Sequence, residues 1–139
     1  MSGDAKSYYS RVAKERIADG VSNPELQRAI QGGFSRKEKF QEKWDSINLS
    51  EFVEKFAPNA IRYVHGVKIY FESPQTGLSV IADLSGYCRL GERIPGQKRL
   101  LYLDKNGNDV RNITLPNGKK TGRERNQQRE LTHFIIKKI

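Results

Sequence analysis

The stretch IRYVHGVKIYF at residues 61–71 decides the fold class, because apolar and polar side chains alternate in it around Gly66. A period of two residues is typical of a β-strand with one buried face, and a glycine between two such runs indicates a turn. SPQTG at 73–77 supplies further turn residues. The segment therefore predicts strand structure with a bend at Gly66.

The pattern of strands and turns continues to the end of the chain. LSVIADL at 78–84, YCRL at 87–90, RLLYLD at 99–104 and LTHFIIKKI at 131–139 are predicted strands. KNGN at 105–108 is a strong hairpin turn, LPNG at 115–118 is another, and TGRE at 121–124 is able to cap a short helix. Residues 58–139 therefore predict a sheet of about five antiparallel strands.

Residues 1–57 are patterned as helices instead. The first two expected helices are 5–19, which ends at Gly20, and 24–32, which has Asn23 as its N-cap. The third, 35–47, is opened by a Ser35/Glu38 capping box and carries an apolar stripe of Phe40, Trp44 and Ile47. A short fourth helix runs from Ser50 to Pro58. The fold class is α+β, with N-terminal helices followed by a twisted antiparallel sheet. We divide the chain at this change into a helical segment, 1–57, and a basic sheet segment, 58–139.

The positive charge is concentrated in the sheet segment. Residues 1–60 carry ten Lys and Arg against nine Asp and Glu, whereas residues 61–139 carry fifteen against seven, a net charge of +8. Such asymmetry indicates an anionic partner, either nucleic acid or an acidic protein. A basic surface without a partner is the alternative.

Several classes of protein are disfavoured by what the chain lacks. A single cysteine, Cys88, is expected to be a small buried hydrophobe, and the two histidines are 68 residues apart, so we predict no metal site and no other cofactor. There is no phosphate-loop motif. No apolar run approaches the roughly 20 residues of a membrane span, which predicts a protein without one. A metal-dependent nuclease is accordingly the least favoured enzyme.

Cleavage of RNA is chemistry that the remaining side chains are able to perform. RNA carries its own nucleophile, the 2′-OH, so that the protein must supply a proton acceptor, cations for the phosphate and a donor to the leaving oxygen. Histidine is the natural proton carrier near neutral pH, and the planar guanidinium of arginine suits a phosphate.

His133 is the preferred proton carrier, because it lies beside Thr132 and follows Arg123, Arg125 and Arg129. The alternative is a half-buried histidine with a structural role. Arg89, within the strand YCRL, either points into a cleft or packs its stem and extends its head to solvent; we favour the cleft.

Lys68 and Tyr70 are expected on one strand face together with Glu72, where they would assist catalysis or form a plain exposed surface. The candidate catalytic residues are His133, Arg89, Thr132, Arg123, Tyr70 and Lys68. The candidate RNA-binding residues are Lys119, Lys120, Arg125, Arg129, His65 and Arg62.

Three longer motifs carry a resemblance to a known family: ESPQTGLSVIADLSGYCRL at 72–90, YLDKNGN at 102–108 and GRERNQQRELTHF at 122–134. Over residues 58–136 the chain resembles the C-terminal toxin domains of contact-dependent growth inhibition effectors (CdiA proteins) and related bacterial polymorphic toxins. The matching positions are Thr76, Gly77, Asp83, Tyr87, Arg89, Gly122, Arg123, Thr132 and His133, whereas Cys88 stands where the pattern has phenylalanine.

The resemblance implies a ribonuclease of the barnase/EndoU/colicin/RelE-like group that cleaves tRNA without metal. It implies delivery from the producing bacterium as part of a large surface effector and action in the cytoplasm of the target cell. It also implies neutralisation by a cognate immunity protein, expected to be acidic, and leaves room for a host-cell activating factor. The helical segment would then serve import into the target cell or pack on the nuclease sheet. The runner-up is a basic RNA-binding module without catalysis.

Overall fold

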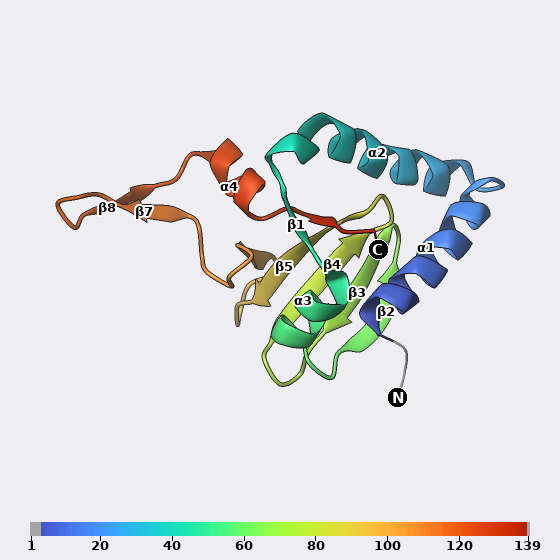
Figure 1. Cartoon of the computed structure of the whole chain (residues 1–139), viewed down its shortest axis with the longest axis horizontal. Coiled ribbons are helices and arrows are strands. Elements are labelled where there is room, and N and C mark those ends of the chain that lie inside the picture. The colour runs from blue at the N-terminus through green and yellow to red at the C-terminus, as the bar shows by residue number, and fades with distance from the viewer. Residues whose placement is uncertain (1–3, 139) are drawn as a thin grey trace.

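The computed structural model describes residues 4–138 and confirms the α+β fold class (Figure 1). The elements are α1 (Ala5–Gly20), α2 (Pro24–Phe40), the 3-10 turn η1 (Gln41–Lys43), β1 (Asp45–Ile47), α3 (Leu49–Phe56), β2 (Ile61–His65), β3 (Lys68–Glu72), β4 (Leu78–Asp83), β5 (Tyr87–Arg93), β6 (Leu100–Leu103), β7 (Asn112–Thr114), β8 (Lys120–Gly122), α4 (Arg125–Leu131) and β9 (Phe134–Ile136). None of the helices in the described part of the chain is long and apolar enough to cross a membrane.

The main sheet is mixed, with strand order β1-β9-β5-β4-β3-β2 and β6 also paired with β5. Strands β2 to β5 form an antiparallel meander, and β9 is antiparallel to β5. Strand β1, which comes from the helical segment, pairs parallel with β9 and makes one edge of the sheet. Strands β7 and β8 form a separate hairpin that protrudes from the body of the molecule (Figure 1).

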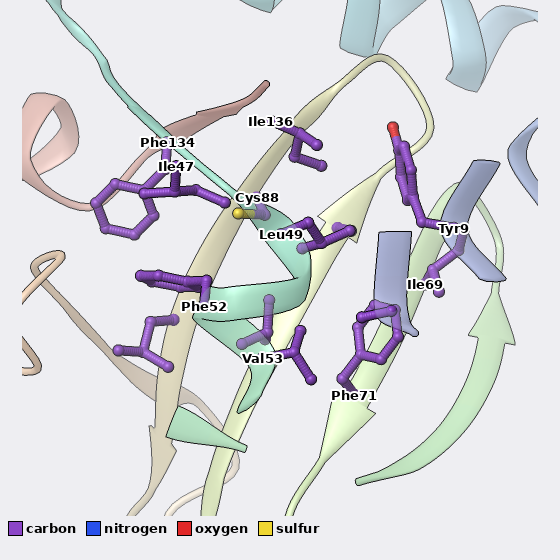
Figure 2. Packing of buried hydrophobic residues seen from close by; sticks show 14 of the residues in the cluster. Tyr9, Ile47, Leu49, Phe52, Val53, Ile69, Phe71, Cys88, Phe134 and Ile136 are labelled. Atoms are coloured by element: carbon purple, nitrogen blue, oxygen red, sulfur yellow. The ribbon is translucent and has the colours of Figure 1, made fainter. Parts of the chain in front are cut away.

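The hydrophobic core formed by the described residues lies between the sheet and the helices α1 and α3, and it also includes Leu26 and Ile30 of α2. Figure 2 shows Leu49 and Phe52 of α3 packed over Cys88 and Phe134 of the sheet, where Phe134 is 1% exposed. Complete burial of a side chain of this size contributes roughly 2–3 kcal/mol. Residues of 1–57 and of 58–139 thus belong to the same core, and the helical segment is packed on the sheet.

Three of the expected helix boundaries were wrong: the end at Gly32, the start at the Ser35/Glu38 capping box and the end at Ile47. Helix α2 runs through Gly32 to Phe40 instead of ending at Gly32. The reason is packing, because a Cβ on Gly33 would meet the side chains of Asp83 and Ser85, so that glycine here allows the helix to approach the β4–β5 turn. Propensity at a glycine is overridden by such a contact.

The expected helix over 35–47 was also wrong in its second half. The chain leaves the helical conformation after Lys43, and Trp44 and Ile47 are buried around strand β1, whereas Phe40 is exposed. The following helix is capped by Asn48, whose Oδ1 accepts from the backbone N–H of Glu51 at 3.1 Å, and not by Ser50. Pairing with β9 explains the change, because it supplies backbone hydrogen bonds that a sequence pattern does not reveal.

Candidate functional site

Two cross-strand rows of side chains occupy the face of the sheet opposite the core. The strand register aligns Arg89, Ile81, Tyr70 and Tyr63 in one row, and Tyr87, Asp83, Lys68 and His65 in the next. Alternate residues of the same strands, such as Ile69, Phe71 and Cys88, belong to the core. The strand register, combined with the alternation of side chains along each strand, therefore places Lys68, Tyr70 and Arg89 on one surface, together with His65.

Arg89 is held in a half-buried position without an acidic partner. Its Nη2 donates to Thr132 Oγ1 at 3.3 Å, and its guanidinium carbon lies 3.4 Å from the ring centre of Tyr102. The Nε atom is buried and unpaired, and no salt bridge to Arg89 exists within residues 4–138. Burial lowers the pKa of this guanidinium, because it disfavours the charged form. A buried cation of this kind is suited to an incoming anion.

His133 lies directly before β9 in an aromatic setting. Its ring stacks on Trp44 with centroids 4.9 Å apart and lies 5.7 Å from the ring of Tyr87. The Nδ1 atom is 2.6 Å from the carbonyl oxygen of Arg129. Because a carbonyl only accepts, the neutral tautomer that satisfies this contact carries its proton on Nδ1 and leaves Nε2 as an acceptor.

The surroundings of His133 keep it neutral at physiological pH. Burial lowers its pKa to about 4, and the positive charges of Arg89, Lys68 and Arg129 act in the same direction. A neutral imidazole with a free Nε2 is able to accept a proton, whereas it has none to donate. The geometry therefore favours a general base over a general acid at this position.

Lys68 differs from Arg89 because its charge is already paired. Its Nζ lies 2.8 Å from the carboxylate of Asp83, a side chain that is 1% exposed and also accepts from the backbone N–H and the hydroxyl of Ser85. Lys68 Nζ also donates to the Tyr87 hydroxyl at 3.4 Å, and Arg36 Nε donates to the same hydroxyl at 3.3 Å. Lys68, Asp83 and Tyr87 of the second row are thus joined in one network of hydrogen bonds.

Two cavities on this face share three lining residues, Arg99, Leu100 and Tyr102. The first, of about 400 Å³, is lined by side chains that include Arg89, Thr132, Tyr102, Arg125, Gln128 and Arg129. The second, of about 760 Å³, is lined by Tyr63, His65, Tyr70, Arg93, Lys98, Arg99, Leu100 and Tyr102. His133 lines neither of them, although the preceding residue, Thr132, lines the first. The walls of both cavities carry several cations.

The structure does not bring every candidate residue into this site. Arg123 donates from Nε to the carbonyl of Val110 at 2.8 Å and so fixes the segment before α4. Lys119 and Lys120 lie on the protruding β7–β8 hairpin (Figure 1). Arg62 lies on the opposite face of the sheet, with its guanidinium 5.0 Å from the ring centre of Tyr8. Of the remaining candidates, Arg89, Thr132, Arg125 and Arg129 line the first cavity and Tyr70 and His65 line the second, whereas His133 and Lys68 line neither.

Sequence reasoning missed several residues that shape the site. Trp44 was assigned to a helix, and no local signal indicates that it stacks on His133. Tyr102 and Tyr63 lie on the same sheet face as Arg89 and Tyr70, and the period of two along their strands was the sequence signal that could have placed them there. Asp83 and Tyr87 were marked only by the toxin resemblance. Thr76, marked in the same way, instead joins the turn at 73–77 to α3 through a 2.7 Å bond to the carbonyl of Phe56.

Comparison of the chain with protein-family models, with curated proteins and with solved structures found no match. Among residues 4–138, no group of three or more His, Cys, Asp or Glu side chains is arranged to hold a metal ion. Interpretation of the site therefore depends on its own geometry.

Proposed function

We propose that this chain is a ribonuclease toxin that cleaves RNA, with tRNA as its substrate class, through attack of the 2′-OH and without a metal ion. The observation that carries the proposal is the pairing of a half-buried cation, Arg89, with a neutral histidine, His133, on the polar face of the sheet. The first is suited to a phosphate and the second to a proton.

In the reaction, Nε2 of His133 accepts the proton of the 2′-OH while the 2′-oxygen bonds to phosphorus and the bond to the 5′-oxygen breaks. The products are a 2′,3′-cyclic phosphate and a free 5′-hydroxyl. Arg89, oriented by Thr132, holds the phosphate oxygens, where the developing charge is greatest. Solvent water supplies the proton that the leaving oxygen needs, while Lys68, held by Asp83, contributes only its positive charge beside His133.

The toxin part of the proposal is supported by charge and by the resemblance. The sheet segment carries a net charge of +8, and the cavities are lined by Arg93, Arg99, Arg125 and Arg129. An acidic immunity protein would be attracted to the surface that attracts RNA, and would block it. Delivery by a surface effector and activation by a host-cell factor belong to the same proposal.

The test is incubation of the purified chain with total cellular RNA, with and without EDTA, followed by a denaturing gel. We expect discrete fragments of tRNA size in both lanes, loss of these fragments in His133→Ala and Arg89→Ala, and normal cleavage by Arg11→Ala, a change at an exposed arginine of α1. Fragments that disappear with EDTA would contradict metal-independent cleavage. RNA that is bound but left intact would instead indicate the non-catalytic RNA-binding module.

A further inference from the structure

We propose that the second cavity is a nucleobase-binding subsite, in which an unpaired base of single-stranded RNA stacks on Tyr63. The inference rests on the proposed function for its orientation, because the neighbouring cavity would hold the phosphate. It adds the conformation of the substrate to that proposal, because the RNA must be unpaired at the base that stacks on Tyr63. Single-stranded loops and ends are the RNA elements that proteins read by stacking bases on aromatic rings.

The geometry of the tyrosines supports a stacking platform. Tyr63 and Tyr70 lie face to face, with ring centroids 4.7 Å apart and planes 4° from parallel. Tyr63 is 38% exposed and lies on the edge strand β2, so the tyrosine pair lines the cavity from its outer end. Tyr70 supports Tyr63 from within the sheet, which fixes the orientation of the ring before a ligand binds. Such pre-ordering reduces the entropy that binding costs.

The charges around the tyrosines fit a polyanion. Arg93, Lys98, Arg99 and His65 line the same cavity, and the acidic neighbour is Glu72, which lies beside Tyr63 on β3. A row of aromatic rings flanked by cations is the arrangement that binds bases and backbone together in proteins that recognise single-stranded nucleic acid. A purely apolar partner would not require these cations, whereas an acidic protein would not require the parallel ring stack.

The two cavities are placed for one continuous strand of RNA. Tyr63 and Arg89 lie in the same cross-strand row, separated by Tyr70 and Ile81, which corresponds to three strand spacings or about 14 Å. Tyr102 lines both cavities and lies under the guanidinium of Arg89. A phosphate at Arg89 and a base at Tyr63 are therefore within reach of one short oligonucleotide.

The experiment measures binding of 2′-O-methyl RNA, which has no 2′-OH and cannot be cleaved by the proposed reaction. Fluorescence anisotropy would be recorded for the intact chain with a labelled single strand, with the same sequence as a duplex, and with a strand carrying abasic sites. We expect the single strand to bind most tightly. The substitution Tyr63→Leu should lower the affinity for the single strand roughly 5- to 150-fold, which is the effect of losing one stacked base. It should change the affinity for the abasic strand little.

Matched variants keep the result interpretable. Tyr63→Phe retains the ring and should retain the affinity, and Phe40→Ala removes an aromatic ring that is 47% exposed elsewhere on the surface and should have no effect. Equal affinity of Tyr63→Leu and the wild type, or equal affinity for duplex and single strand, would overturn the subsite. Cleavage is not part of this measurement, so a protein that binds through Tyr63 and never cleaves would contradict the ribonuclease proposal alone.

Discussion

The side chains of Arg89 and Thr132 meet between the middle of β5 and the segment that leads into β9, although 43 residues separate them in the chain. Thr132 accepts from the guanidinium at 3.3 Å and donates to the carbonyl of Gln128 at 2.8 Å, so its hydroxyl hydrogen is engaged within α4. The threonine thereby orients the cation and does not neutralise it. This relationship leaves a positive charge available at the wall of a cavity.

The first prediction separates the catalytic role of Arg89 from stability. We expect Arg89→Met to lose cleavage. Its free energy of unfolding should equal that of the wild type or exceed it by up to about 1 kcal/mol, because an unpaired buried charge is costly and an apolar replacement removes that cost. Arg89→Lys should also cleave poorly, since lysine lacks the bidentate fork. Urea unfolding and the RNA gel check both. A loss of more than about 2 kcal/mol in Arg89→Met would mean that the arginine serves the fold.

The second prediction concerns pH. The pKa of His133 is about 4 in the folded chain and 6.5 in the unfolded chain. As the pH falls, the imidazole is therefore protonated in the unfolded chain before it is protonated in the folded one. The contribution of the neutral histidine to stability is therefore complete above about pH 6.5 and is lost as the pH falls towards 4, by on the order of 3 kcal/mol. Urea unfolding at pH 7 and at pH 4.5 should show a smaller loss in His133→Gln than in the wild type. Identical losses would contradict the lowered pKa.

The third prediction compares two adjacent glycines of α2. A Cβ at Gly33 would meet the carboxylate of Asp83 and lie 3.2 Å from Ser85 Oγ, whereas at Gly32 the nearest neighbour is the flexible end of Arg36 at 3.6 Å. We expect Gly33→Ala to destabilise by about 1–3 kcal/mol through overpacking, and Gly32→Ala to stabilise by roughly 0.5–1 kcal/mol through helix propensity. Thermal melting of the two variants decides it, and equal melting temperatures would contradict the close packing of α2 on the β4–β5 turn.

The fourth prediction concerns the ion pair of Lys68 and Asp83. Lys68→Met would leave the buried carboxylate without its cation and is expected to destabilise by about 3 kcal/mol. Addition of Asp83→Asn should recover part of that loss, which gives a coupling energy above about 1 kcal/mol. Arg111 and Asp109 form the control, since they are also 2.8 Å apart but exposed, and should couple by at most about 1 kcal/mol. Equal coupling in the two pairs would contradict the role of burial.

Much of the fold was predictable because it is written in local patterns. The alternation in 61–71 gave β2 and β3, and the Asn106-Gly107 turn was recognised from its residue types; Asp104 Oδ1 accepts there from the N–H groups of Asn106 and Asn108 at 2.9 Å. Burial of Cys88 was also confirmed, and burial raises the pKa of its thiol. Periodicity and turn chemistry depend only on near neighbours, so one sequence suffices for them.

The candidate site was predictable in part for the same reason. Strand alternation placed Lys68 and Tyr70 on one face, and the strand register of the structure brings Arg89 onto that same face. The stacking of Trp44 on His133 was not predictable, because it requires the parallel pairing of β1 with β9, two segments that lie about 90 residues apart. The continuity of α2 through Gly32 likewise depended on a contact between Gly33 and the distant Asp83.

By itself, the sequence determined the α+β class, the concentration of positive charge in the second segment, and the residues that share a strand face. Only the tertiary structure decided that Arg89 has no acidic partner within residues 4–138 while Lys68 has Asp83, and that His133 is enclosed enough to remain neutral. The physical reason is range: propensity and periodicity act over a few residues, whereas burial, ion pairing and pKa depend on groups that only folding brings together.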